Sequence, residues 1–221
     1  MQMTKNFFRV FIINMKINNV TFGAKPINHS FIRKIDKNSG KFVKIPVNFV
    51  KLEADNKFDM SAMNNIAEKW KDAKYIRKIA TASHWMNARK FVEIDVYALT
   101  TQEKNFEILK PKKIVGCVEM RNDERNPKSR KVYYLQVKPS MMNVNNPENK
   151  YERVGSTILD SLKKIYKSLS LYSDDNKAIK KFYKRNGFIE DYNNKNHYSW
   201  SLSIFERLKI RYNAFIRKNG F

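Results

Sequence analysis

The segment from Lys150 to Phe188 constrains the fold more than any other part of the chain. It places a turn at Gly155 before an amphipathic helix that extends to Lys167, then a short apolar strand over 169–173, then a second helix. A helix that begins at a glycine turn offers unpaired N–H groups and a positive dipole end, which suit a diphosphate. With a strand before the turn, this order predicts a βαβ unit with a ligand slot at the strand ends.

The apolar periodicity on either side of this segment predicts a mixed sheet. Alternating residues indicate strands over 92–98 and 114–120, which the loop between them makes antiparallel, and a third strand over 131–138 that stops at Pro139. Residues 188–192 and 197–203 predict a closing hairpin. The chain therefore favours an α/β fold with a central sheet and flanking helices.

Two helix starts are predicted from capping residues. One-sided apolar spacing indicates a helix from Asp59 or Ser61 to Ala80. Asp174 or Asp175 is expected to cap the helix that carries Phe182 and Tyr183 and ends at Gly187.

The two ends of the chain differ from its centre. Residues 1–46 predict an extension with its own strands, at 7–13 and in a hairpin of 31–35 and 42–45, and a further strand follows at 47–52. Residues 204–221 predict a basic amphipathic helix. Packing on the parent domain is the ordinary role of such a helix, and homodimer contact, RNA or a membrane surface are the alternatives. We expect the principal domain to span 47–203.

Net charge is the second informative feature. The chain carries 44 basic residues against 21 acidic ones, a formal charge of +23. Biased base composition accounts for many lysines but not for the shortage of carboxylates. A field of this sign attracts polyanions, so tRNA, the ribosome or an acidic protein is an expected partner.

Composition also excludes several classes of protein. The single Cys117 rules out an internal disulfide, and the three scattered histidines argue against a zinc site, so no metal is expected. No apolar stretch approaches the ~20 residues of a transmembrane segment. We expect a cytoplasmic protein, or one delivered without a cleavable signal.

The order of elements from Val47 to Ser203 resembles the GNAT acyltransferase superfamily, with recognisable motifs only from Lys131 to Phe188. The resemblance implies a mainly antiparallel central sheet with a βαβ unit that binds an acyl-CoA. It also implies acetyl-CoA as co-substrate. In the family, the strand ending at Pro139 and the strand over 169–173 are parallel but splay apart, and pantetheine lies between them.

The family's phosphate loop reads Arg/Gln-x-x-Gly-x-Gly/Ala, and the matching segment here is Lys150 to Gly155. Lys150 replaces Arg/Gln and Arg153 replaces the first glycine, so Arg153 must adopt an ordinary conformation or bear strain. Its charge could compensate beside the phosphates. The longer connection over 140–149 either lines the acceptor side or is a surface insertion. The positions that the resemblance assigns to acetyl-CoA are Leu135, Val137, Lys150, Arg153, Val154, Gly155, Ser156, Thr157 and Asn176.

Tyr183 is the candidate catalytic residue. In the family, the tyrosine of a pattern that here runs from Asn176 to Phe188 points its hydroxyl at the thioester sulfur. A phenol is protonated at neutral pH and is a suitable acid for a departing thiolate. The alternative is a core tyrosine beside Phe182.

Other catalytic roles remain open from the sequence. An amine would attack the thioester directly, with a backbone N–H near Val137 stabilising the oxyanion, and the general base stays unassigned. Cys117 lies in an apolar strand beside no activating histidine, which argues against a nucleophile.

Three functions follow from these observations. The first is acetyl transfer to an amino group of a macromolecule, an aminoacyl-tRNA or a protein. The second is acetylation of a small amine, against which the positive field argues. The third is a non-enzymatic polyanion-binding protein on a degraded GNAT scaffold, which the altered loop favours and Tyr183 opposes.

Overall fold

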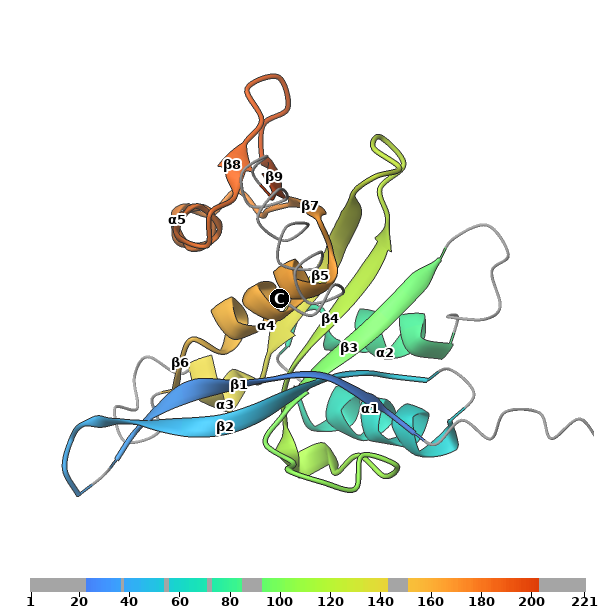
Figure 1. Ribbon diagram of the computed structural model, residues 1–221, viewed down its shortest axis with the longest axis vertical. Coiled ribbons are helices and arrows are strands. Elements are labelled where there is room, and N and C mark those ends of the chain that lie inside the picture. Colours follow the sequence, from blue (N-terminus) through green and yellow to red (C-terminus); the bar gives the residue numbers. More distant parts are fainter. Residues whose placement is uncertain are drawn as a thin grey trace, which may run out of the picture.

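The computed structural model describes residues 23–36, 38–53, 56–70, 73–84, 93–142 and 151–202. The strand predicted at 7–13, the helix predicted at 204–221 and Lys150 lie outside these ranges. The described strands form one sheet in the order β6-β1-β2-β3-β4-β5-β7-β9-β8 (Figure 1). The strands are β1 Lys25–Ile35, β2 Phe42–Lys51, β3 Ile94–Thr100, β4 Ile114–Asn122, β5 Arg130–Val137, β6 Tyr151–Glu152, β7 Ser168–Tyr172, β8 Ile189–Glu190 and β9 His197–Ser201. The helices are α1 Lys57–Lys69, α2 Ile76–His84, α3 Pro139–Met142, α4 Val154–Ile165 and α5 Lys177–Arg185, and a 3₁₀ turn covers Pro111–Lys113.

The sheet is antiparallel except at one place. Among the described strands, only β5 and β7 run parallel. They are joined by α4, which makes β5-α4-β7 the predicted βαβ unit. The mixed, mainly antiparallel α/β sheet predicted from the sequence is confirmed.

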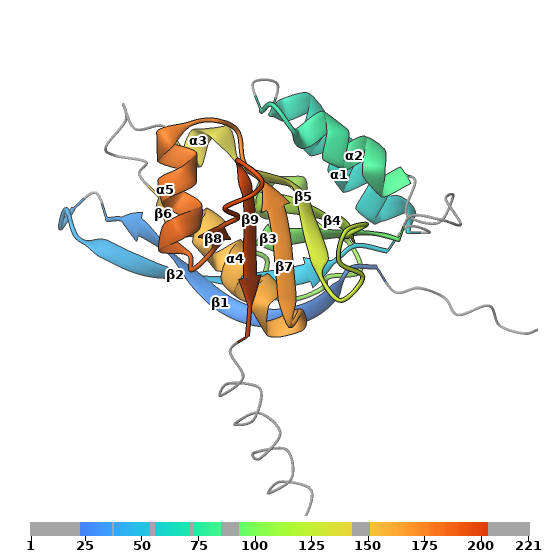
Figure 2. The same ribbon diagram turned by 90° about the horizontal axis from the view of Figure 1, so that it is seen from above.

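Each face of the sheet has its own apolar core. The helices α1 and α2 cover one face, and α4 covers the other (Figure 2). Alternation along β4 supplies both, since Cys117 packs toward α1 and α2 while Val118 packs toward α4. Helices therefore cover both faces of the sheet, as in other layered α/β folds.

The helix predicted between residue 59 or 61 and Ala80 is in fact two helices. α1 ends at Trp70, whose backbone leaves the helical region (φ −96°, ψ 50°), and the N–H of Ala73 turns back to the Trp70 carbonyl at 2.8 Å. The apolar spacing continues across the break because Trp70 and Ile76 bury into the same core. The start also differs from the prediction: Asn56 caps α1 through its side-chain oxygen, which accepts from the N–H of Phe58 at 2.8 Å.

The structure from α4 to Gly187 agrees closely with the prediction from the sequence. α4, β7 and α5 occur in the predicted order, and Gly187 ends α5 at φ +76° with Phe188 buried behind it. The cap of α5 was predicted wrongly. Asn176 accepts the N–H of Ala178 at 2.8 Å in place of Asp174 or Asp175.

The β1–β2 hairpin is part of the sheet. β2 is one strand from residue 42 to 51, so the strands predicted at 42–45 and 47–52 are continuous across Pro46. β1 pairs with β2 and β6, and the Thr157 hydroxyl of α4 donates to the Phe31 carbonyl at 3.1 Å. The division of the chain at residue 46 stays a prediction. In the described part of the chain, no helix is long and apolar enough to span a membrane.

Asp59 gives a pH-dependent contribution to stability that can be measured. Its side chain is buried and accepts the Glu53 N–H at 2.9 Å. Burial raises the pKa of Asp59 to about 6. A carboxyl with a raised folded-state pKa stabilises the fold below its unfolded pKa, and this contribution is lost as the pH rises through 6.

We therefore expect Asp59→Asn to change the pH profile of unfolding. From pH 4 to pH 7 the wild type should lose roughly 2 kcal/mol relative to the variant, because the folded and unfolded pKa values of Asp59 differ by about 2 and the unfolded carboxyl is already partly ionised at pH 4. Urea unfolding of both proteins at four pH values gives this difference. Parallel profiles for the two proteins would show that ionisation of Asp59 is not suppressed by burial.

Candidate functional site

β5 and β7 separate after a short parallel contact. Their paired residues are Arg130 with Leu169, Lys131 with Ser170, and Val132 with Leu171. β5 then continues to Val137 with β4 as its partner on the other side. The two parallel strands therefore diverge and leave a wedge between them, as the resemblance implied.

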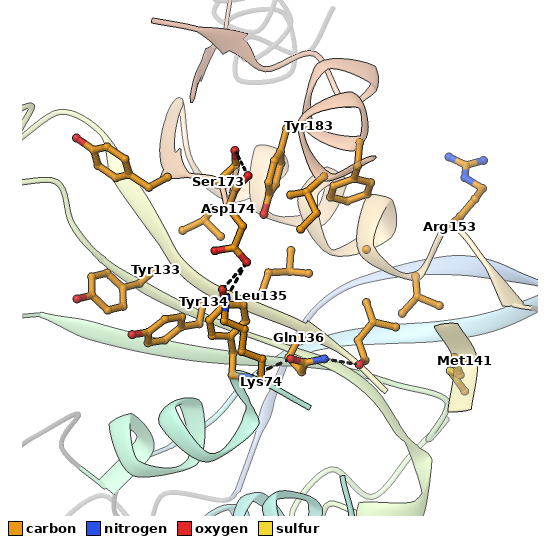
Figure 3. A pocket seen from close by; sticks show the side chains of 18 of the residues that line it. Lys74, Tyr133, Tyr134, Leu135, Gln136, Met141, Arg153, Ser173, Asp174 and Tyr183 are labelled. Carbon is orange, nitrogen blue, oxygen red and sulfur yellow. Dashed lines mark hydrogen bonds and ion pairs between the residues drawn. The ribbon is translucent and has the colours of Figure 1, made fainter. Parts of the chain in front are cut away.

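A cavity of about 870 Å³ occupies this wedge. Its walls come from β5, the start of α4, the end of β7, one face of α5 and the connection before α2. In Figure 3, Arg153 and Met141 lie at one end of the cavity and Tyr133 and Tyr134 at the other. Tyr183 and Asp174 lie between these ends.

The free edge of β5 presents backbone groups to the cavity. The Lys138 N–H donates to the Val115 carbonyl at 3.0 Å, toward β4. Because amide directions alternate along a strand, the N–H groups of Leu135 and Val137 face the wedge. The Val137 carbonyl already accepts from the Gln136 side chain at 2.9 Å. Both predicted β5 residues line the cavity.

The N-terminus of α4 closes one end of the cavity. Arg153 is the N-cap, and no side chain of the described residues caps this helix. The first-turn N–H groups are therefore available to a ligand, with the positive end of the helix dipole behind them. Gly155 allows close packing here, since a Cβ at this position would lie 3.0 Å from the Phe182 ring, closer than an ordinary contact.

Arg153 has the backbone of the glycine that it replaces. Its φ of 69° and ψ of 4° lie in the left-handed region, so the strained alternative considered from the sequence is the one observed. Its guanidinium lies 3.8 Å from the Asp160 carboxylate and 5.4 Å from the centre of the Phe31 ring. These contacts hold the charge at the rim of the cavity beside the α4 N-terminus.

Tyr183 projects from α5 into the middle of the cavity (Figure 3). Its ring packs against Phe182, Phe188 and Tyr198 at centroid distances of 5.1, 5.9 and 6.0 Å. The hydroxyl makes no hydrogen bond with any described residue. Burial, with Tyr75 and Asp174 nearby, raises the pKa of Tyr183 to about 12, so the phenol is protonated at neutral pH.

Three predicted ligand-binding residues lie outside the cavity lining. Ser156 and Thr157 are in the first turn of α4, and the Thr157 hydroxyl is bound to β1. Asn176 caps α5. By contrast, Val154 and Gly155 line the cavity together with Arg153.

A polar link that sequence reasoning missed lies in the wall of the cavity, between its two ends. The Asp174 carboxylate accepts from the Tyr75 hydroxyl at 2.8 Å and from Lys74 Nζ at 3.0 Å, which joins the end of β7 to the start of α2. These two donors hold the pKa of Asp174 below its usual range. Its position directly after a parallel strand was the available signal, because ligand-contacting side chains gather there.

Arg153 offers a direct test of backbone strain. We expect Arg153→Gly to exceed Arg153→Ala in free energy of unfolding by about 1 kcal/mol, because both variants lose the guanidinium contacts and only glycine relieves the left-handed conformation. Urea denaturation of the pair measures this difference. An alanine variant as stable as the glycine variant would contradict the strained backbone.

No protein-family model matches the chain, and no curated protein matches it in sequence. Among solved structures, the chain is similar to the PaiA N-acetyltransferase from Thermoplasma acidophilum in complex with coenzyme A, at 15% identity and a TM-score of 0.43 over 71% of this chain and 99% of that one. It is also similar to AtaTR bound with AcCoA, at 16% identity and a TM-score of 0.46 over 70% and 92% of the two chains. A third similar structure is the NatC complex bound to a Gag peptide and CoA, at 14% identity and a TM-score of 0.45 over 71% of this chain and 99% of that one.

These scores describe a distant likeness of fold and say nothing of activity. Within the described residues, no cluster of His, Cys, Asp and Glu could hold a metal ion. The chain has the mainly antiparallel sheet, with one parallel βαβ unit splayed around a cavity, that the resemblance to the GNAT superfamily implied.

Proposed function

We propose that the chain is an acetyl-CoA-dependent N-acetyltransferase. The observation that supports this most strongly is the wedge cavity, which has the α4 N-terminus at one end and, in its middle, a Tyr183 hydroxyl that no described residue hydrogen-bonds. A phosphate-binding end and a proton donor within one cavity fit a thioester carried on a diphosphate.

Three groups of the chain would hold acetyl-CoA. The N–H groups of Leu135 and Val137 would pair with the amides of pantetheine along the free edge of β5. The first turn of α4, from Val154, would bind the diphosphate, and Arg153 would add a positive charge there. Lys150 is a further candidate from the sequence.

Tyr183 would assist the departure of the sulfur. With a pKa of about 12, its proton is held more tightly than that of a free thiol, whose pKa is ~8.5. The hydroxyl would therefore act mainly by donating a hydrogen bond to the developing thiolate. A backbone N–H near Val137 that does not pair with pantetheine is the candidate donor to the oxyanion.

The acceptor that we favour is an amino group of a macromolecule, an aminoacyl-tRNA or a protein. The net charge of +23 attracts polyanions and repels small cationic amines. Lys74 and Lys131 line the cavity, and Asp174 is the one carboxylate among its described lining residues. An α-amino group, with a pKa near ~8, needs least help from a general base, which we leave unassigned.

A polyanion-binding protein on a degraded scaffold is the second candidate. The left-handed Arg153 in place of a glycine favours it, because a side chain at this position limits close approach of a diphosphate to the backbone.

Tyr183→Phe tests the proposed mechanism. We expect turnover to fall by about 10²-fold or more, while calorimetry finds the affinity for acetyl-CoA unchanged. Tyr166→Phe is the matched control, because it removes a half-buried phenol that lies outside the cavity and hydrogen-bonds to Tyr97 at 2.6 Å. Equal turnover in Tyr183→Phe and the control would remove Tyr183 from the mechanism.

The class of acceptor is open to a separate test. We expect labelled acetyl groups to appear in the RNA or protein fraction of a cell extract incubated with the enzyme and acetyl-CoA, as resolved by mass analysis. Label confined to small molecules would contradict a macromolecular acceptor.

A further inference from the structure

A second hollow lies against the cavity and shares two side chains with it. This hollow, of about 360 Å³, is lined by parts of α2, β3, β4 and β5. Tyr133 and Tyr134 line both spaces, so these tyrosines form a common wall. Figure 3 shows them side by side at the end of the cavity that is farther from Arg153.

A β-bulge places both tyrosines on this wall. In the register of β4 with β5, Glu119 pairs with Tyr134 and Met120 pairs with Val132, so Tyr133 is an extra residue. Neighbouring residues of a regular strand point to opposite faces, whereas a bulge redirects one of them. Tyr133 and Tyr134 consequently touch edge to face, with centroids 4.8 Å apart.

The second hollow is positively charged. Its charged lining residues are Arg77 and Lys78 of α2 and Arg121 of β4, with no carboxylate among the described lining residues. Arg121 pairs at 2.6 Å with Glu119, which is buried beneath it. Arg77 and Lys78 are exposed and make no ion pair with any described residue. Two positive charges are therefore uncompensated at the rim.

Aromatic rings lie against two cations of β4 and β5, Arg121 and Lys131. The Arg121 guanidinium lies 3.6 Å from the centre of the Tyr133 ring, and Lys131 Nζ lies 5.4 Å from the same ring and 4.8 Å from that of Tyr172. Tyr133 and Tyr172 remain 37% and 41% exposed. Exposed rings interleaved with cations suit unpaired bases and their phosphates.

We propose that this tyrosine–cation surface, made of Arg77, Lys78, Arg121, Lys131, Tyr133 and Tyr172, binds an unpaired segment of nucleic acid. Phosphates would occupy the second hollow, and a base would stack on Tyr133 or Tyr172. A duplex hides its base faces and could not use the rings. An acidic peptide would match the cations but would leave the exposed rings without planar partners.

The surface adjoins the cavity through the shared wall of Tyr133 and Tyr134. An unpaired strand bound there would bring its end toward Tyr183. Only this last step depends on the proposed acetyl transfer, for which it names the acceptor as a nucleic acid with an accessible amine. Binding itself does not depend on it.

Fluorescence anisotropy with a labelled RNA strand of about 12 nucleotides tests the surface. We expect Arg77→Ala/Lys78→Ala to weaken binding about tenfold and to lower the salt slope by about 1.4, since each phosphate contact with a single strand contributes about 0.7. Lys112→Ala/Lys113→Ala removes the same charge from the exposed 3₁₀ turn, outside both spaces, and should leave the slope unchanged.

The stacking part has its own matched pair. Tyr133→Ala should weaken binding about tenfold at an unchanged salt slope, whereas Tyr133→Phe keeps the ring and should bind normally. The duplex of the same sequence should bind more weakly than the strand. Three results would each overturn the inference. They are equal losses of RNA affinity in the α2 and 3₁₀ variants, equal affinity for the duplex and the single strand, and competition by polyglutamate as strong as that by the unlabelled strand.

Calorimetry with acetyl-CoA separates this inference from the proposed function. Arg77→Ala/Lys78→Ala should bind acetyl-CoA as the wild type does. RNA binding without any acetyl-CoA binding would reject the transferase and leave the surface in place. Acetyl-CoA binding without RNA binding would reject the surface alone.

Discussion

β5 keeps β7 as a hydrogen-bonded neighbour only as far as Val132, and the rest of the candidate site depends on this early separation. A strand that loses one neighbour exposes N–H and C=O groups that need partners. Here the exposed edge lines the wedge cavity, and residues of α4 and α5 form other parts of its wall. The same divergence leaves room for Tyr183 to reach the centre of the cavity.

The order of the strands and helices could be predicted because apolar periods of 2 and 3.6 residues persist in each element. The break after Trp70 could not, because the apolar faces of α1 and α2 stay in phase across it and bury into one core. The caps were misassigned for a related reason. Asp59 accepts the Glu53 N–H, and Asp174 accepts from Tyr75 and Lys74. Other partners therefore engage these carboxylates, and Asn56 and Asn176 cap the helices.

Within the candidate site, the sequence located the strands and helices better than it located the contacts between their side chains. Leu135, Val137, Val154, Gly155 and Tyr183, which the resemblance assigned to the site, line the cavity. The neighbouring tyrosines of β5 could not be placed together in advance, since a bulge depends on the register with β4. Motif matching also gave no indication that α2 would contribute cations beside them.

Selective binding of acetyl-CoA tests the central claim most directly. Acetyl-CoA would be titrated calorimetrically into the protein at elevated salt, with ATP as the control, because so basic a chain binds many phosphates weakly at low salt. Our account predicts saturable binding of acetyl-CoA well above that of ATP. Equal, weak binding of both ligands would contradict it and would leave a polyanion-binding protein on a GNAT-type fold.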